Sequence, residues 1–286
     1  MTDEYTIDNS EEPTQKTPSS TPHPFLKWAG SKRYILKHII GAFPQSFNTY
    51  REPFLGGGSL FFFLKPEKAI LSDTNEDLIN TYLAIRHNVD SVFDYISLLK
   101  PNKTTYYKIR EKRSKGKLKR AAEFIYINKT CWNGLYRVNS KGVFNVPYGS
   151  PKNNYIADID NLRKCSNLLN KETIELRTCD FEEALTGTKQ GDLVYLDPPY
   201  VTGHSNNGFV EYNEKIFSWA DQIRLAKVAK KLSSIGAHVL VSNANHTQVL
   251  ELYKGFDKIQ IDRNSTLAGD INKRGKVSEV LLFSSS

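Results

Sequence analysis

Four consecutive residues have side chains and backbone groups suited to chemistry on an amino group: Asp197, Pro198, Pro199 and Tyr200. Proline fixes φ, and a residue that precedes a proline is held in an extended conformation. Asp197 and Pro198 each precede a proline, so the Asp197 carboxylate and the Pro198 carbonyl are acceptors with fixed directions. Two converging acceptors suit an exocyclic –NH2 group, and Tyr200 offers a flat face for the ring that carries it. A strand that merely ends in a proline-rich turn is the structural alternative.

The elements that must position this motif can be read from the residues around it. The apolar run Leu193 to Leu196 predicts a buried strand that stops at Asp197. Farther upstream, Gly56, Gly57 and Gly58 lie between a short strand and an apolar helix-like run, so the backbone there can approach a ligand closely.

Two features limit what that ligand can be. The glycine spacing matches neither a phosphate-binding P-loop nor the G-x-G-x-x-G of dinucleotide folds, which argues against a dehydrogenase. The stretch Ala69 to Asp73 predicts a second strand that ends in an acid, and an acid in this place commonly binds ribose hydroxyls.

The chain from about Phe25 to Phe283 resembles the Dam-type DNA adenine-N6 methyltransferases. The Asp-Pro-Pro-Tyr motif is similar to the catalytic motif of amino-methyltransferases, and the order of cofactor loop, recognition insertion and catalytic motif is that of the family. The resemblance implies methyl transfer from S-adenosylmethionine to N6 of an adenine flipped out of double-stranded DNA. It further implies GATC as the target, although relatives in the wider family read other sites.

The same resemblance assigns roles to individual residues. The expected catalytic residues are Asp197, Pro198, Pro199 and Tyr200. The residues expected to bind S-adenosylmethionine are Trp28, Lys32, Gly56, Gly58, Asp73, Asp180 and Asp197. The residues expected to contact DNA are Lys27, Trp132, Asn133, Leu135, Arg137 and Pro147. No metal is expected, because the methyl donor already carries positive charge.

Alternating strands and helices predict an α/β fold with a mostly parallel sheet, helices on both faces and a site at the carboxyl ends of the strands. The resemblance makes this a Rossmann-like methyltransferase sheet formed by residues 25–76 and 160–286. The alternation breaks down over residues 77–159, where we expect an inserted, mainly helical DNA-recognition domain. Residues 1–24 are rich in Thr, Ser, Pro and Glu and are expected to form a disordered tail.

The segment from Cys131 to Gly149 carries the residue types that read or wedge DNA. Turn-forming residues from Asn139 to Gly142 predict a β-hairpin. Arg137 can fork onto a guanine edge, and Trp132 can fill the stack when a base leaves. Composition alone leaves a structural aromatic cluster equally open, and the resemblance to the family's recognition hairpin favours the DNA-binding interpretation.

The charge of the chain indicates a polyanionic partner. The 286 residues carry a formal net charge of +8 with a sequence pI of about 9.2. Residues 1–24 have a net charge of −4, from five acids and one lysine, which leaves +12 on the remainder. Eight basic residues against one acid lie between Lys108 and Arg120. Phosphate contact is the favoured interpretation of this run, and a solvated charged face is the alternative.

The cysteines and the hydropathy of the chain indicate the cellular compartment of the protein. Cys131, Cys165 and Cys179 form no C-x-x-C pair, which argues against a disulfide framework and a zinc site. No apolar run reaches the ~18 residues of a membrane span, and there is no signal-peptide core. We therefore expect a cytoplasmic, DNA-associated protein with no membrane partner, and a monomer is the working expectation.

Three alternative functions remain at this stage. A cytosine-N4 methyltransferase would use the same chemistry, but Asp at the first motif position is the form that the family uses on adenine. An RNA- or protein-directed amino-methyltransferase is disfavoured by the resemblance of the recognition segment. A DNA-binding protein without activity should lack catalytic or cofactor residues, and none is missing.

Overall fold

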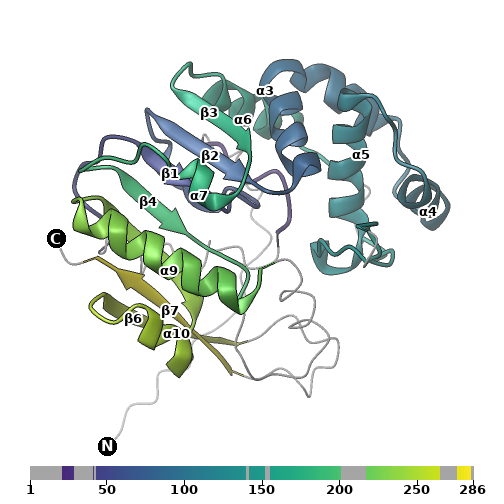
Figure 1. Ribbon diagram of the computed structural model, residues 1–286. Helices are drawn as coiled ribbons and strands as arrows, with labels where there is room; N and C mark the ends of the chain where they lie inside the picture. The colour runs from purple at the N-terminus through teal and green to yellow at the C-terminus, as the bar shows by residue number, and fades with distance from the viewer. Residues whose placement is uncertain are drawn as a thin grey trace, which may run out of the picture.

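A seven-stranded sheet organises the protein (Figure 1). The computed structural model describes residues 21–28, 41, 43–139, 142–151, 155–200, 217–264 and 276–284. The strands are β1 (Tyr50–Glu52), β2 (Ala69–Asp73), β3 (Ile174–Thr178), β4 (Leu193–Leu196), β5 (His238–Ala244), β6 (Asp257–Asn264) and β7 (Lys276–Phe283). Their order in the sheet is β3-β2-β1-β4-β5-β7-β6. The first five in this order are parallel, whereas β7 is antiparallel to both β5 and β6. This mixed α/β sheet is consistent with a Rossmann-like methyltransferase.

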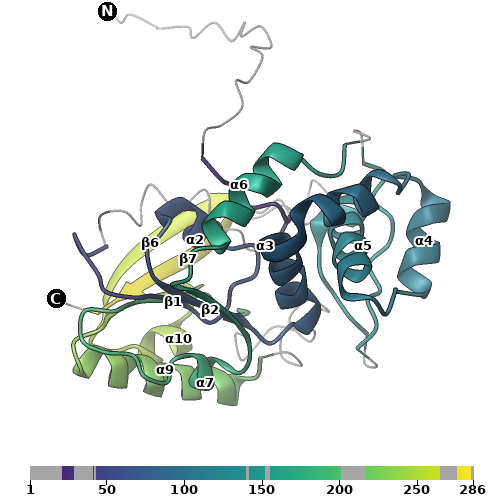
Figure 2. The same ribbon diagram turned by 90° about the horizontal axis from the view of Figure 1, so that it is seen from above.

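Helices cover both faces of the sheet (Figure 2). They are α2 (Ser59–Leu64), α3 (Glu76–Ser97), α4 (Lys103–Glu111), α5 (Lys117–Thr130), α6 (Ile159–Leu169), α7 (Phe181–Ala184), α9 (Trp219–Ser234) and α10 (Thr247–Leu252). In Figure 2, α2 and α6 lie above the sheet, and α7, α9 and α10 lie below it. Among the described residues, no helix combines the length and apolarity needed to span a bilayer.

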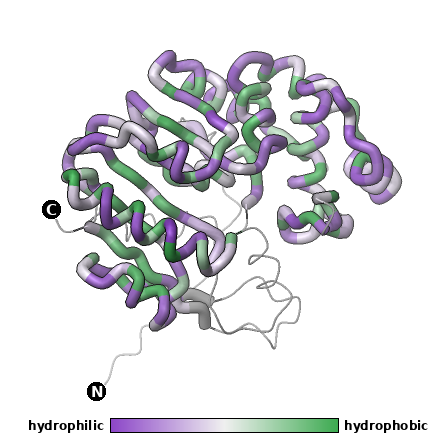
Figure 3. The backbone as a smooth tube through the Cα atoms, in the orientation of Figure 1, coloured by the Kyte–Doolittle hydropathy of each residue, from purple (hydrophilic) through white to green (hydrophobic). Residues whose placement is uncertain are grey.

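The continuous apolar run of β4 is explained by these two layers. Leu193 and Tyr195 face the core shared with α2, α3 and α6, and Val194 and Leu196 face the core shared with α7, α9 and α10. A strand buried on both faces has no polar alternation to show, and this is typical of central strands in parallel sheets. Figure 3 shows hydrophobic residues concentrated along the strands of the sheet.

The helices α4 and α5 lie to one side of the sheet, and α3 packs against both α5 and α6 (Figure 1). Much of the stretch 77–159, which was expected to be mainly helical, is formed by α3, α4 and α5. Few residues of α4 are apolar; Tyr106 and Ile109 are its buried ones.

The expected β-hairpin is not confirmed. In the described part of the segment, antiparallel contact is limited to the isolated bridges Val138 to Phe144 and Cys131 to Tyr148. The turn itself is present up to Asn139, which accepts from the N–H of Gly142 at 2.9 Å. A 3-10 turn at Trp132–Gly134 explains the absence of a ladder, because Asn133 has a φ of 52° and Gly134 one of 64°, neither of which is extended.

The expected tail reaches into residues that the structure describes. The backbone N–H of His23 donates to Asn161 Oδ1 at 3.0 Å, and Asn161 Nδ2 donates back to the His23 carbonyl at 2.9 Å. His23 is thus attached to α6, so the boundary drawn at residue 24 includes anchored residues. Residues 1–20 lie outside the described residues, and their disorder stays a prediction.

Local contacts fix the start of α9 and the end of the chain. Ser218 and Asp221 form a capping box at the start of α9, with the Ser218 N–H donating to the Asp221 carboxylate at 2.8 Å. The last two strands, β6 and β7, form an antiparallel pair.

A buried ion pair fixes β1 beside β4. Arg51 Nε donates to Asp192 Oδ2 at 3.0 Å, and both side chains are almost fully buried. Asp192 also accepts from the backbone N–H groups of Thr49 and Lys189, each at 3.1 Å. The Arg51 guanidinium donates in addition to the Gly187 carbonyl at 3.0 Å, which attaches the loop after α7.

Asp192→Asn should destabilise the protein by about 3–5 kcal/mol, because it leaves the buried Arg51 charge without its counterion. The measurement is the free energy of unfolding in urea. The matched control is Asp90→Asn, which breaks the exposed pair with Arg163 and should cost less than about 1 kcal/mol. Equal costs for the two variants would show that the buried pair does not hold the strands.

Candidate active site

Three adjacent strands bring the expected site residues to one edge of the sheet. Parallel β1 pairs with β2 on one side and with β4 on the other. The carboxyl ends of parallel strands lie at the same edge, so the glycine loop after β1, Asp73 at the end of β2 and Asp197 after β4 share it. The fold therefore brings Asp73 and Asp197, which are far apart in the sequence, to the same edge of the sheet.

The glycine loop has a backbone that only glycine adopts easily. Gly56 has a φ of 47° and Gly58 a φ of 63°. The loop is attached to β2, because the Gly56 N–H donates to Asp73 Oδ2 at 3.1 Å. It is also attached to α3, because the Tyr82 hydroxyl donates to the Gly56 carbonyl at 3.1 Å. The glycine loop and Asp73, which were expected to contact one ligand, are thus joined by a hydrogen bond.

Trp28 lies against this loop. A Cβ atom on Gly56 would lie 2.7 Å from both Cδ1 and Nε1 of the indole, and one on Gly57 would lie 3.1 Å from Trp28 Cβ. No larger residue fits at Gly56 without moving the tryptophan. Trp28 therefore reaches the position expected of a ligand contact, whereas Lys32 lies outside the described residues.

The Asp-Pro-Pro-Tyr motif, which is expected to be catalytic, is anchored from two directions. The Tyr200 hydroxyl donates to Glu279 Oε2 on β7 at 3.1 Å, and Gln222 Nε2 on α9 donates to the Pro199 carbonyl at 3.3 Å. Pro198 is buried, whereas Asp197 and Tyr200 are partly exposed. Sequence reasoning missed both anchors, and the one signal for Glu279 was an acid within an apolar strand.

Glu52 is a further residue that sequence reasoning missed. It ends β1, is only 3% exposed, and its Oε2 atom has no hydrogen-bond partner among the described residues. Burial raises the pKa of Glu52 well above its ordinary value, and the negative charge of Asp197 raises it further. Ionising this buried carboxyl beside a second carboxylate is costly, so a cationic ligand at this edge of the sheet would stabilise its charged form.

The residues at this edge fit S-adenosylmethionine in their chemistry. The glycine loop gives close access to the backbone, and Asp73 offers a carboxylate suited to hydroxyl groups. Asp197 offers a carboxylate to a ligand that carries an ammonium and a sulfonium, and the buried Glu52 carboxyl adds an oxygen that has no hydrogen-bond partner among the described residues. Burial raises the pKa of Asp73, but the N–H groups of Asn75 and Gly56 lower it, and both donate to its oxygens at 3.0 and 3.1 Å.

Asp180 is more constrained than expected. Its carboxylate accepts two hydrogen bonds from Arg224 on α9, at 3.1 and 2.9 Å, and one from the Glu182 N–H at 2.9 Å. Arg224 also lies over the Phe181 ring, with 4.4 Å from its Cζ to the centroid. Any contact between Asp180 and a ligand must share the carboxylate with this arginine.

The residues expected to contact DNA gather on the segment after α5. Asn133, Arg137 and Pro147 are exposed, whereas Trp132 and Leu135 are partly buried. The Trp132 N–H donates to the Pro147 carbonyl at 2.9 Å, which joins the two limbs of the segment. Lys27 is exposed as well, and its side chain packs on Gly134, where a Cβ would lie 2.5 Å from Lys27 Cβ.

A cavity of about 410 Å³ lies elsewhere, between the N-terminal segment and α6. Lys27 lines it, but none of Asp73, Asp180 and Asp197 does. None of the described residues expected to catalyse or to bind the cofactor lines this cavity. The candidate active site is therefore the edge of the sheet where β1, β2 and β4 end. A search of the described residues for clusters of three or more His, Cys, Asp or Glu that could hold a metal finds none.

Glu52→Gln should stabilise the free protein more at pH 8 than at pH 5. A carboxyl whose folded-state pKa is raised contributes stability below its unfolded pKa of about 4.3, and this stability is lost as pH rises through the folded-state value. Glutamine cannot ionise and escapes this loss. The measurement is the free energy of unfolding at both pH values. The control is Glu67→Gln, whose side chain is 90% exposed. A Glu52→Gln effect that does not change with pH would contradict the assignment.

Comparisons with known proteins identify the family of the chain. The family profile described as D12 class N6 adenine-specific DNA methyltransferase matches residues 28–267. Type II methyltransferase M1.LlaDCHI of Lactococcus lactis subsp. cremoris is 38% identical over 267 residues, covering 91% of this chain and 94% of the relative. Type II methyltransferase M.MjaIII of Methanocaldococcus jannaschii is 39% identical, covering 91% and 98%. A DNA adenine methylase of Haemophilus influenzae is 33% identical, covering 90% and 92%. The chain therefore belongs to the D12 class of N6 adenine-specific DNA methyltransferases and is an adenine-specific DNA methyltransferase.

Proposed function

We propose that the protein methylates N6 of an adenine that has been flipped out of double-stranded DNA, with GATC as its target sequence. The observation that carries this proposal is the position of Asp197-Pro198-Pro199-Tyr200 at the end of β4, one strand away from the glycine loop after β1. GATC is supported by resemblance to the Dam-type enzymes, and a relative named DNA adenine methylase covers most of the chain.

Asp197 and the Pro198 carbonyl act on the amino group. The N6 lone pair of adenine is delocalised into the ring, which makes the nitrogen a poor nucleophile. If each acceptor takes one N6 hydrogen, the nitrogen moves towards tetrahedral geometry and its lone pair becomes available. Both acceptors are held in place, because proline restrains the backbone on either side and Gln222 bonds the Pro199 carbonyl.

Tyr200 supplies the face on which the flipped base stacks. A base inside a duplex cannot reach the end of β4, so it must leave the stack first. The hydrogen bond from the Tyr200 hydroxyl to Glu279 restrains the ring before the base arrives. A ring restrained in this way loses less conformational entropy when the base binds.

The residues that would hold S-adenosylmethionine are Trp28, Lys32, Gly56, Gly58, Asp73, Asp180 and Asp197. Bound there, the cofactor supplies an activated methyl group on a positively charged sulfur. The chain's own contribution is to bring the glycine loop and Asp197 to neighbouring strand ends, with the buried Glu52 carboxyl at the same edge.

Residues 77–159 form the proposed target-recognition domain. Within it, Arg137 is placed to read a guanine edge, and Trp132 and Leu135 to occupy the space that the flipped base leaves. Arg137 is exposed, and its Nε donates to Asn145 Oδ1 at 2.8 Å, which holds the guanidinium beside the opposite limb. A restrained, exposed arginine is suited to a bidentate contact with a base.

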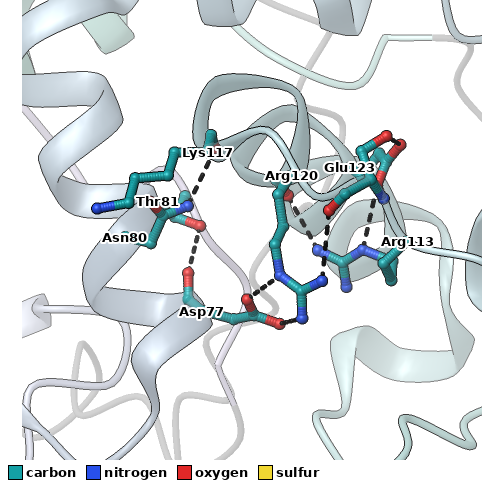
Figure 4. A network of polar contacts seen from close by, with 8 residues as sticks. Asp77, Asn80, Thr81, Arg113, Lys117, Arg120 and Glu123 are labelled. Atoms are coloured by element: carbon teal, nitrogen blue, oxygen red, sulfur yellow. Dashed lines mark hydrogen bonds and ion pairs between the residues drawn. The ribbon is translucent and has the colours of Figure 1, made fainter.

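The basic run between Lys108 and Arg120 divides into two groups. Its three arginines support the fold: Arg120 binds the Asp77 carboxylate and Arg113 binds Glu123 at 3.4 Å (Figure 4), and Arg110 donates to the Val146 carbonyl at 3.1 Å. Its five lysines are exposed: Lys108, Lys112, Lys115, Lys117 and Lys119. We assign phosphate contacts to these lysines and a structural role to the three arginines.

The names of the relatives support a setting for this activity. Two of them are called type II methyltransferases, which favours a role in restriction-modification. Because its substrates would be DNA and S-adenosylmethionine, we propose that the protein works in the cytoplasm, bound to DNA.

The Asp197 carboxylate should act mainly in the transition state, because its hydrogen bond strengthens as positive charge develops on N6. Removing one such preorganised group typically costs 10²–10³ in rate, so Asp197→Ala should lose about that factor in single-turnover methylation while DNA is still bound. Asp197→Asn keeps an oxygen acceptor without the charge and should fall between the two. An alanine variant within a few-fold of wild type would rule out the proposed chemistry.

Changing Lys108, Lys112 and Lys115 to glutamine should reduce the slope of log K against log salt by about 0.9 for each phosphate that is no longer neutralised. All DNA sequences should be weakened alike, as measured by titrations at several salt concentrations. The matched control changes three exposed lysines of α9 in the same way, namely Lys227, Lys230 and Lys231. If the two triple variants have the same slope, the basic run is only a solvated surface.

A further inference from the structure

Four aromatic side chains connect the glycine loop to the recognition segment. They are Trp28, Phe124, Tyr136 and Phe144, and we call them the aromatic bridge. Trp28 and Tyr136 are nearly parallel, with ring centroids 5.5 Å apart and an angle of 17°. Tyr136 also contacts Phe124 on α5 and Phe144 on the opposite limb, each with centroids 5.6 Å apart. Tyr136 is thus the member that contacts the other three.

The bridge begins at the loop that would hold the cofactor. Because the Trp28 indole fills the space where Gly56 would carry a Cβ, the loop and the ring cannot move independently. Packed side chains of this kind respond to displacement as a unit, since protein interiors have little free volume. A ligand that orders the glycine loop therefore also orders Trp28 and the face on which Tyr136 stacks.

The bridge ends beside the residues that would read DNA. Tyr136 lies between Leu135 and Arg137 in the chain, both of which are proposed DNA contacts. Its contact with Phe144 reaches the limb that carries Asn145, the partner of Arg137. Fixing the Tyr136 ring thus restrains both limbs beside Arg137, the side chain that is proposed to read a base.

A second set of contacts holds the same two parts together. The Asn128 side chain accepts from the Lys27 N–H at 2.8 Å and donates to the Lys27 carbonyl at 2.6 Å. Asn128 is only 3% exposed, and its own carbonyl accepts from the Cys131 thiol at 3.4 Å. The backbone next to Trp28 is therefore fixed to α5. The indole itself stacks on Tyr136 and on Phe124, with centroids 5.5 and 6.4 Å apart, so Tyr136 is the nearer ring and the one that joins Trp28 to the recognition segment.

We propose that Tyr136 is a positioning residue that couples cofactor binding to DNA recognition, so that each ligand binds more tightly when the other is present. The inference rests on the proposed function, which places the cofactor against Trp28 and DNA against Arg137. Coupling of this kind is reciprocal, and a contiguous packed network can carry it. The ring face of Tyr136 is what matters, so phenylalanine should replace it.

The test is a binding cycle for wild type, Tyr136→Phe and Tyr136→Ala. The affinity of S-adenosylhomocysteine is measured by calorimetry with and without a DNA duplex that contains the sequence which the protein methylates. In wild type and Tyr136→Phe, DNA should tighten cofactor binding by at least about fivefold, the lower end of usual couplings. In Tyr136→Ala the factor should fall towards one. The control is Tyr107→Ala, an α4 residue outside the bridge that packs on Tyr106 and Arg110, which should keep the wild-type factor.

The possible outcomes distinguish a failure of this inference from a failure of the proposed function. Wild-type coupling in Tyr136→Ala, or two ligands that bind wild type without any coupling, would overturn the inference and leave the proposed function intact. A wild-type protein that binds neither ligand would overturn both. Tyr136→Leu is measured as well, since it keeps apolar volume without a flat face. It should lose coupling even if Tyr136→Ala fails to fold.

Discussion

The ion pair between Arg51 and Asp192 fixes the relation between the two strands on which the site depends. Asp192 precedes β4 and binds both the Arg51 side chain of β1 and the backbone of Thr49, which precedes β1, so the register of one strand against the other is set near their amino ends. From there each strand runs to the opposite edge, where β1 ends in the glycine loop and β4 in the proposed catalytic motif. A shift between the strands would separate the proposed cofactor cradle from the proposed catalytic carboxylate.

The same edge of the sheet concentrates acidic side chains in a way that stability alone does not explain. Glu52 and Glu279 are 3% and 2% exposed, and Asp197 lies between their strands in the sheet. Glu279 is used by Tyr200, whereas Glu52 keeps an oxygen without a hydrogen-bond partner in the described residues. Ionising a buried carboxyl costs free energy in the free protein. A positively charged cofactor offsets that cost when it binds, which connects the chemistry of the methyl donor to the electrostatics of the apoprotein.

The features that sequence reasoning predicted correctly are those encoded by neighbouring residues. The apolar run before Asp197, the glycine triplet and the acid at the end of β2 each carry their signal within a few positions. The roles of Glu279 and Arg224 could not be predicted in this way, because their partners Tyr200 and Asp180 lie 79 and 44 residues away. The basic run shows the limit most clearly. Counting charges cannot distinguish Arg120, which binds Asp77, from the exposed lysines beside it.

The recognition segment was harder to predict, because its conformation depends on contacts with the rest of the protein. Turn chemistry at Asn139 indicated a hairpin, but the positive φ of Asn133 and Gly134 breaks the extended pairing that strands require. The stacking of Trp28 on Tyr136 was also hidden, because the two residues belong to segments that the fold brings together. Only the aromatic composition of the segment indicated that some cluster would form.

The central claim is that this edge of the sheet methylates adenine N6 at a defined DNA sequence. The most direct test is to express the chain in a host that lacks adenine methylation and to map modified bases across its DNA. We expect N6-methyladenine at one short sequence, with GATC as the predicted site, and none in a host that expresses the Asp197→Ala variant. Methylation of cytosine N4, or unmodified DNA from a host with abundant folded wild-type protein, would contradict the proposed function.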